Sequence, residues 1–231
     1  FTKYIFLIFI IPIYCQFGKN IVQYKSFDWH YIQSKYFDIY FYNDDFNSEK
    51  INANAEFVAK ESLKSYDIIS NAIGWKLKNR IPIIVYNSHN DFQQTNVIDM
   101  FMPEGVGGVT ELYKNRVVIP FDGNNQQFKH VIHHELVHAF INDYIYKGSI
   151  QNMQNNDVVL IPLWMNEGLA EFLSSSWDTE SEMWIRDLVI NGEKLPKLNE
   201  LNGYLAYRGG QSVWKYIVEE LDTLYNQGKT G

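Results

Sequence analysis

The spacing of hydrophobic and polar residues changes character about halfway along the chain. The first half holds short runs in which β-branched and aromatic residues dominate, and such runs between turn-forming residues predict strands. They cover residues 27–42, 81–86, 109–113 and 116–120. Between the first two runs, residues 49–73 carry apolar side chains at helical spacing, with Ser48 as candidate N-cap and Gly74 as the end. The first half is therefore predicted to form strands and one long helix.

Helical spacing dominates the second half. The predicted helices run from a turn at 122–124 to about 146, from Pro162 to about 175, from Ser176 or Asp178 to about 190, and over 204–224, with a short element at 195–202. The pair Gly209-Gly210 marks an interruption or a start of the last helix. Strands first and helices last predict an α+β fold. We expect a mixed, mainly antiparallel sheet with helices in a sheet-rich part, 18–121, and then a helical C-terminal half, 122–231.

Composition and charge restrict the partners more than the fold. Hydrophobic residues make up 46% of the 231 residues, enough for one sizeable core, which favours one domain with a helical annex over two independent units. The formal net charge is −7 and no long basic run is present, whereas binding to nucleic-acid phosphates requires clustered Lys and Arg. Nucleic acid is therefore not an expected partner.

The first 17 residues have the pattern of a secretory signal peptide. Lys3 precedes an apolar run at 4–14, and cleavage is expected near 15–17. The run is shorter than the about 20 apolar residues that span a membrane; a buried first strand and an uncleaved anchor are the alternatives. Cys15 is the only cysteine, so the mature chain, 18–231, would have no thiol. We expect a secreted or periplasmic protein without stable membrane insertion.

The stretch that carries chemistry is H-E-L-V-H at 134–138. Residues four apart lie on the same face of a helix, so His134 and His138 can present two imidazoles to one metal ion. Glu135 then points beside them, toward a water that such a metal activates. The pattern H-E-x-x-H alone is short enough to occur by chance, so its meaning depends on a third ligand.

Glu167 is the candidate for that third ligand. A catalytic zinc ion commonly has three protein ligands and one open position. Residues 139–166 separate Glu167 from His138 and are long enough for a loop and a returning helix. Glu171 lies about one helical turn further on and shares a face with Glu167. It can therefore accept a hydrogen bond from the outer nitrogen of a ligand histidine. The predicted cofactor is one Zn²⁺ ion.

These motifs together resemble a known family of enzymes. H-E-L-V-H, followed by W-M-N-E-G-L-A-E at 164–171, is similar to the gluzincin metallopeptidases, including the aminopeptidase N type. Their shared pattern is H-E-x-x-H and a downstream N-E-G-x-A whose Glu is a zinc ligand. The resemblance implies a zincin-like metallopeptidase fold with Glu135 as general base. It implies the zinc ligands His134, His138 and Glu167.

A weaker match extends the resemblance to the last helix. Y-R-G-G at 207–210 is similar to the Y-x-K-G segment of aminopeptidase N relatives, in which the Tyr stabilises the tetrahedral intermediate. Tyr207 would inherit that role. Because the pattern is compressed to Y-R-G here, Tyr204 is the competing candidate.

Another weaker match concerns the substrate. G-V-T-E-L at 108–112 has the Gly and Glu spacing of the G-x-M-E-N segment, which binds the substrate amino terminus in aminopeptidase N relatives, but departs at the Met and Asn positions. Gly108 and Glu111 are therefore candidate substrate-binding residues, and a solvated strand carboxylate is the alternative for Glu111.

His130 is interpreted as a partly exposed helix residue or as a fourth polar group at the cleft, and His133 as an outer partner of the site or a packing residue.

The mature chain as a whole looks like the secreted peptidase-MA-like domains that often precede a TolB-type β-propeller in bacterial proteins. F-D-W-H-Y-I-Q-S-K-Y-F-D-I-Y-F-Y at 27–42 and I-P-I-I-V-Y-N-S-H-N-D-F-Q-Q-T-N at 81–96 carry this likeness, which covers nearly all of 18–225. It implies a C-terminal β-propeller in the full-length chain.

Three functions are compatible with these residues. The first is a zinc metallopeptidase acting on a peptide or protein. The second is a binding or assembly module of the cell envelope with a catalytically silent zinc site; a structural site normally has four protein ligands, and only three are obvious here. The third is a zinc hydrolase of non-peptide amides. The acidic Glu135, which a structural site does not need, favours an enzyme.

Overall fold

The structure is a computed structural model, and its strands and helices follow the predicted order. It describes residues 22–44, 51–98, 102–147, 161–192 and 196–228. The strands come first and the longer helices of the second half come last, which confirms the α+β class. The predicted signal peptide at 1–17 lies outside the described residues.

Five strands form one sheet in the order β1-β2-β3-β5-β4. They are β1 Trp29–Gln33, β2 Phe37–Tyr42, β3 Ile81–Tyr86, β4 Val109–Glu111 and β5 Arg116–Pro120. The outer pairs, β1–β2 and β4–β5, are antiparallel, whereas the inner pairs, β2–β3 and β3–β5, are parallel. The sheet is therefore mixed, but the prediction that it is mainly antiparallel is wrong. The long helix between β2 and β3 carries the chain back to the end of the sheet at which β2 begins. β3 therefore runs in the same direction as β2, as is usual for strands joined by a crossover helix.

The strand boundaries differ from the predicted ones where a turn interrupts a β-like run. The run at 27–42 is a hairpin, closed by the Ser34 amide and the Phe37 carbonyl oxygen at 2.8 Å. The run at 109–113 is a strand only to Glu111, because the Glu111 carboxylate accepts the Tyr113 amide proton at 2.7 Å and starts the turn to β5. β3 and β5 have the predicted bounds.

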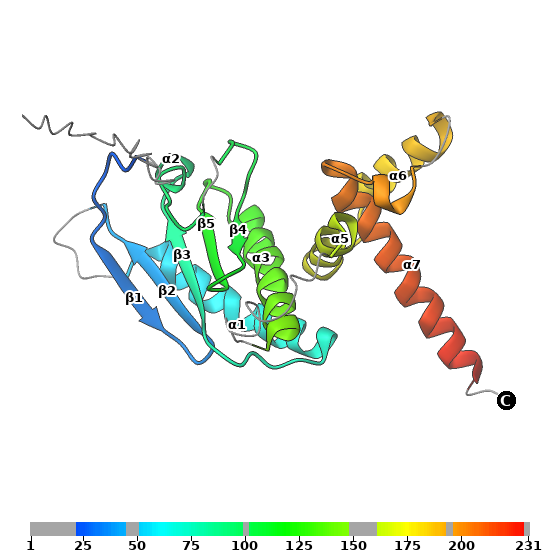
Figure 1. Ribbon diagram of the computed structural model, residues 1–231, viewed down its shortest axis with the longest axis horizontal. Helices are drawn as coiled ribbons and strands as arrows, with labels where there is room; N and C mark the ends of the chain where they lie inside the picture. The colour runs from blue at the N-terminus through cyan, green and yellow to red at the C-terminus, as the bar shows by residue number, and fades with distance from the viewer. Residues whose placement is uncertain (1–21, 45–50, 99–101, 148–160, 193–195, 229–231) are drawn as a thin grey trace, which may run out of the picture.

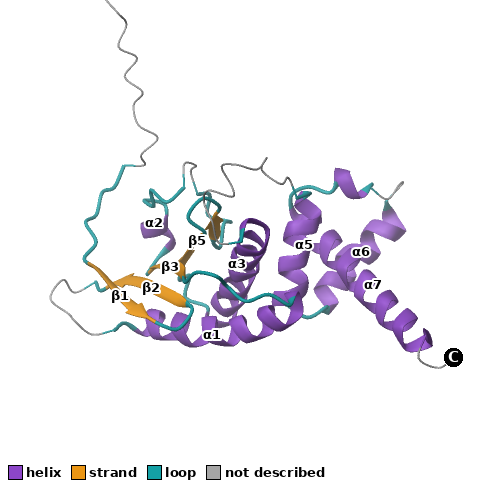
Figure 2. Ribbon diagram, turned by 60° about the horizontal axis from the view of Figure 1, so that its bottom comes forward, coloured by secondary structure: helices purple, strands orange, loops and turns teal. Residues whose placement is uncertain are grey.

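Alternating side chains give the sheet two apolar faces. On one face, helices α1 (Ala53–Ile73) and α3 (Asn125–Tyr146) pack against side chains of β2, β3 and β5 (Figure 2). The largest buried side chains of this core include Phe37, Ile39, Ile83, Ile119, Phe128, Ile132 and Phe140. The opposite face carries a smaller cluster, in which Phe92 of helix α2 (His89–Phe92) packs with Tyr42, Tyr86 and Val118. The larger core fixes α3 against the sheet.

Side-chain caps set the ends of several helices. Helix α1 begins at Ala53, because the Asn52 side chain accepts the Ala55 amide proton at 2.8 Å; the predicted cap, Ser48, lies outside the described residues. Gly74 ends α1 in the left-handed conformation with φ 69°, as predicted. Helix α6 (Thr179–Asn191) is capped by Asp178, one of the two predicted residues.

The last helices gather at the end of the molecule away from the sheet, beyond α3 (Figure 1). They are α5 (Leu163–Ser174), α6 and α7 (Tyr204–Gly228), with a short 3₁₀ turn, η1 (Leu198–Glu200), before α7. Helix α7 runs without interruption through Gly209-Gly210, so the prediction of a break there is wrong. In the described part of the chain, no helix combines the length and the apolar character that a membrane crossing requires.

Two glycines explain how α5 and α7 cross without a break. A Cβ atom built on Gly168 would lie 2.3 Å from the carbonyl carbon of Gly210, and one built on Gly210 would lie 2.1 Å from the carbonyl oxygen of Trp164. The two helix backbones are therefore in direct contact at this crossing. Glycine is required here for close approach rather than for an unusual φ.

We predict that Gly168→Ala destabilises the fold by about 1–3 kcal/mol, the usual cost of overpacking, because the methyl group has only backbone atoms of α7 to displace. Urea unfolding measures this free energy. Gly105→Ala is the matched control, since nothing lies within 4 Å of a Cβ there. Equal stability of the two variants would contradict the helix contact.

Candidate metal centre

Helix α3 holds the two motif histidines side by side. The Nε2 atoms of His134 and His138 lie 3.2 Å apart, and their side chains are only 9% and 11% exposed. The opposite side of the same helix turn carries Leu136 and Phe140, which are buried in the core against the sheet. Core packing therefore fixes the rotation of α3 and directs both imidazoles away from the sheet.

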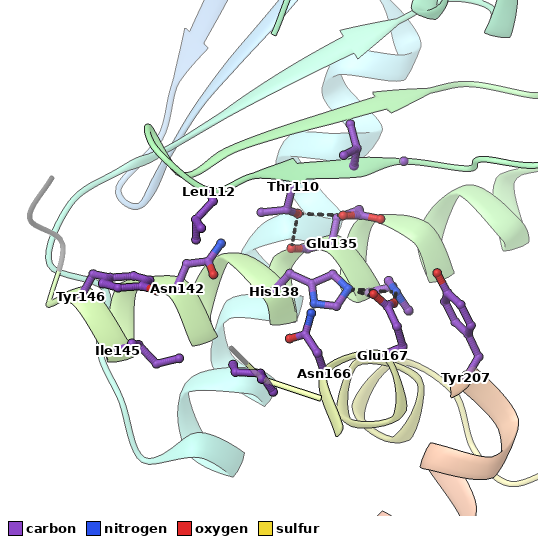
Figure 3. A pocket seen from close by; sticks show the side chains of 14 residues that line it. Thr110, Leu112, Glu135, His138, Asn142, Ile145, Tyr146, Asn166, Glu167 and Tyr207 are labelled. Atoms are coloured by element: carbon purple, nitrogen blue, oxygen red, sulfur yellow. Dashed lines mark hydrogen bonds and ion pairs between the residues drawn. The ribbon is translucent and has the colours of Figure 1, made fainter. Parts of the chain in front are cut away.

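Helix α5 adds Glu167 to this pair (Figure 3). Its Oε2 atom lies 3.2 Å from Nε2 of His134 and 3.2 Å from Nε2 of His138. The three atoms thus form a triangle with equal sides. Nitrogen and oxygen ligands of a tetrahedral zinc ion, about 2.0–2.1 Å from the metal, are about 3.3 Å from one another. The three side chains could therefore hold a metal ion, and their spacing fits zinc.

Electrostatic attraction links the Glu167 carboxylate to the two imidazoles. Burial by itself would raise the pKa of Glu167, but hydrogen bonds with His134 and His138 lower it to about 2. Burial would lower the pKa of His134, but the carboxylates of Glu167 and Glu171 raise it to about 10. The buried carboxylates therefore favour positive charge beside the imidazoles, and a metal cation bound by neutral imidazole would supply it.

Glu171 lies on the other side of the His134 ring. Its Oε1 atom is 3.1 Å from Nδ1 of His134, a short contact that is not aligned as a hydrogen bond, and 3.3 Å from Nε2 of His130. Its Oε2 atom accepts a hydrogen bond from Nη1 of Arg208 at 3.1 Å. Burial opposes the charge of Glu171, but His130 and His134 hold its pKa well below the usual range. The carboxylate therefore lies against the outer nitrogen of His134, but without the alignment of the predicted hydrogen bond.

Glu135 is held by the edge strand β4. The Thr110 hydroxyl oxygen lies 2.7 Å from Oε2 of Glu135 and 2.9 Å from its backbone carbonyl oxygen (Figure 3). The Glu135 carboxylate lines the same cavity as His134, His138 and Glu167. The structure thus brings the candidate base beside the three candidate ligands and fixes it with one hydroxyl group.

The two tyrosine candidates have different surroundings. Tyr207 lines the cavity, and its ring stacks on that of His134 with 5.8 Å between centroids and 17° between planes. Burial, followed by the carboxylates of Glu167 and Glu135, raises the pKa of the Tyr207 hydroxyl, which therefore keeps its proton. Tyr204 is 44% exposed and contacts Arg208 and other side chains outside the cavity. Of the two tyrosines, only Tyr207 lines the cavity.

The two predicted substrate-binding residues also differ. Gly108 lines the cavity, and a Cβ atom there would lie 2.9 Å from Cγ of Glu135, so glycine lets the chain before β4 approach α3. Glu111 does not line the cavity. Its carboxylate forms an ion pair with Nε of Arg116 at 3.0 Å and accepts the Tyr113 amide proton. The structure therefore places Gly108, but not Glu111, beside the candidate metal ligands.

The remaining histidines of α3 lie outside the triangle. His130, His134 and Glu171 form a second group of possible ligands, with atoms within 4.8 Å of one another. Because Glu171 is already paired with the permanent cation of Arg208, the group around Glu167 is the better metal candidate. His133 is buried, and burial followed by the charges of nearby cations lowers its pKa to about 4, so it packs as a neutral ring.

A cavity of about 440 Å³ opens beside the three candidate ligands. Polar side chains line it as well as apolar ones, among them Asn142 and Asn166. Its apolar end is the part that Leu112, Ile145 and Tyr146 line. Figure 3 shows Leu112, Ile145 and Tyr146 on the side of His138 that faces away from Tyr207. Space for a ligand is therefore present on both sides of the candidate metal centre.

Sequence reasoning missed two polar residues of the site. Thr110 stands in the G-V-T-E-L segment, but its contact with Glu135 depends on where β4 meets α3. Arg208 directly follows Tyr207 in the sequence. Its partner is the buried carboxylate of Glu171, a residue that the motifs had already singled out. The apolar end of the cavity was missed because Leu112 and Ile145 come from separate elements.

Comparisons with protein-family models, with curated proteins and with solved structures found no match to this chain.

We predict that His138→Ala weakens zinc binding by more than about 100-fold, since removal of even an outer partner of a ligand costs about 10–100-fold. Competition with a chromophoric chelator measures the affinity. His30→Ala is the control, because His30 lies on β1 at the far edge of the sheet. Equal affinities of the two variants would remove His138 from the metal centre.

Proposed function

We propose that this protein is a zinc-dependent metallopeptidase. The observation that carries the proposal is the triangle of His134, His138 and Glu167, with the Glu135 carboxylate beside it in a cavity. Three ligands are the usual protein contribution to a catalytic zinc site, which keeps one position open, whereas a structural site normally has four. A carboxylate beside an open position is what hydrolysis requires of a general base.

When bound, zinc would supply a water of lowered pKa and polarise the substrate carbonyl group. The Glu135 carboxylate takes a proton from the attacking water and passes it to the leaving nitrogen. Thr110 orients that carboxylate through its hydroxyl group. Tyr207 lines the same cavity, and its hydroxyl group keeps its proton. It can therefore donate a hydrogen bond to the negatively charged oxygen that forms when water attacks the carbonyl group.

The resemblance to gluzincin peptidases supports the same assignment. In the resembling pattern, the Glu of N-E-G-x-A joins the two histidines of H-E-x-x-H, and here Glu167 lies 3.2 Å from both. A zincin-like fold is part of this proposal. A signal peptide at 1–17, a secreted or periplasmic location and a C-terminal propeller stay predictions.

Two other functions are less favoured. A binding module of the cell envelope could hold zinc in the same triangle, but it has no use for Glu135 or for the cavity beside it. A zinc hydrolase of non-peptide amides would use the same base and the same ligands, so the choice of a peptide substrate rests on the resemblance.

We predict that Glu135→Gln keeps zinc bound and lowers the turnover of peptides by at least about 100-fold, because the amide cannot accept the proton of the water. Zinc content and cleavage of a mixed peptide library would be measured together for wild type and variant. Undiminished cleavage by the variant would remove Glu135 from the mechanism.

We predict that Thr110→Val lowers turnover by about tenfold, because the carboxylate loses a charge-assisted hydrogen bond and with it a fixed position. Thr110→Ser is the matched control; it keeps the hydroxyl group and should keep most of the activity. Zinc affinity should be the same in both variants. Loss of activity in both, or in neither, would contradict an orienting role of the hydroxyl group.

A further inference from the structure

The Glu111 carboxylate, a candidate anchor for a free amino terminus, is already occupied. Four donor contacts surround it. The amides of Tyr113 and Lys114 donate at 2.7 and 3.1 Å, with a longer contact of 3.3 Å from Lys114, and Nε of Arg116 lies at 3.0 Å. The side chain is 11% exposed. The carboxylate thus closes the turn between β4 and β5 and has little capacity left for a ligand.

The carboxylates that do face the cavity have other partners. Among the described residues that line it, the acidic side chains are Glu135 and Glu167. Glu135 is held by Thr110, and Glu167 by two imidazoles. An ammonium group taken from water into this cavity would need a carboxylate of its own, because an unpaired buried charge is strongly unfavourable.

The end of the cavity beyond His138 offers a different kind of contact. Leu112 and Ile145 are half-buried there, and Tyr146 is buried. The one polar side chain that Figure 3 shows among them, Asn142, donates a hydrogen bond to Oδ1 of Asn115 at 3.3 Å. These side chains come from the turn after β4 and from the last turns of α3. A half-exposed apolar side chain loses its remaining contact with water when an apolar group of a ligand covers it. This end of the cavity therefore favours an apolar substrate side chain.

We propose that the enzyme cleaves internal peptide bonds next to an apolar residue and does not require a free amino terminus. This inference rests on the proposed peptidase function. The reaction is a hydrolysis: the C–N bond breaks, the oxygen of one water joins the carbonyl carbon, and a proton reaches the leaving nitrogen. The candidate metal centre lies between the apolar end and the Tyr207 end, so the chain of a substrate can continue on both sides of the cleaved bond.

The test uses zinc-loaded full chain and pairs of peptides that differ only in an acetylated or free amino terminus. Mass spectrometry identifies the cleaved bonds, and kcat/KM is measured for each pair. We expect values for acetylated and free peptides within about threefold of each other, and about a tenfold or greater loss when the apolar residue next to the cleaved bond is replaced by Asp. Cleavage restricted to the first bond of unblocked peptides would overturn the inference while leaving the peptidase function intact.

Two variants test separately whether Glu111 binds an amino terminus and whether the apolar end binds a substrate side chain. Glu111→Gln should leave the ratio of kcat/KM for acetylated and free peptides unchanged, even if it weakens the turn. A selective loss on free peptides would show that Glu111 does bind the amine, contrary to the inference. Ile145→Lys should lower kcat/KM on the apolar peptide about tenfold and improve its acceptance of Asp.

Ile190→Lys is the matched control, since Ile190 is 69% exposed on α6 and does not line the cavity. Zinc content and thermal stability of both Lys variants verify that they fold. Equal activity of the Ile145 and Ile190 variants would overturn the role of the apolar end. If the zinc-loaded wild type cleaves no peptide at all, the proposed function fails, and this inference fails with it.

Discussion

One imidazole ring joins the two halves of the molecule. His134 stands on α3, which is packed against the sheet, and its two nitrogens face two carboxylates of α5: Nε2 is 3.2 Å from Glu167 and Nδ1 is 3.1 Å from Glu171. The two carboxylates are about one helical turn apart and so lie on one side of α5, which lets them reach both edges of one ring. A rotation of α5 by one residue would remove both contacts. This ring therefore helps to set the position of the helical half relative to the sheet, together with Ala170, Leu169 and Leu173 of α5, which pack into the core.

The same arrangement positions the groups that α7 contributes. Gly168 lies between the two carboxylates on α5, and its direct backbone contact with Gly210 sets how closely α7 approaches. Helix α7 then brings Tyr207 over the His134 ring and Arg208 to Glu171. Arg208 also contacts Ser181 of α6, so one cation connects three helices behind the candidate metal centre. In the N-E-G motif, Gly168 therefore sets how closely the two helices pack, and Glu167 provides the candidate metal ligand.

The sequence predicted what depends on local spacing and missed what depends on tertiary pairing. Helical periodicity placed His134 and His138 on one helix face and Glu167 and Glu171 on another, and β-branched runs marked most strands. The parallel inner pairs were missed, because the direction of a strand depends on the crossover and not on its own residues. The partner of Glu111 was missed for a similar reason: Arg116 meets it only once β4 and β5 pair. The choice between the two tyrosines required the rotation of α7, which the short Y-R-G pattern does not contain.

The proposed function requires a metal ion, held by the two helices α3 and α5, that makes this chain a hydrolase. Removal of the metal and its stepwise return would test this most directly. Peptide cleavage would be measured after treatment with a chelator and again as zinc is added back. The account predicts that cleavage disappears on chelation and rises in proportion to zinc until one ion per chain is bound. Cleavage that survives chelation, or none at any zinc content, would contradict it.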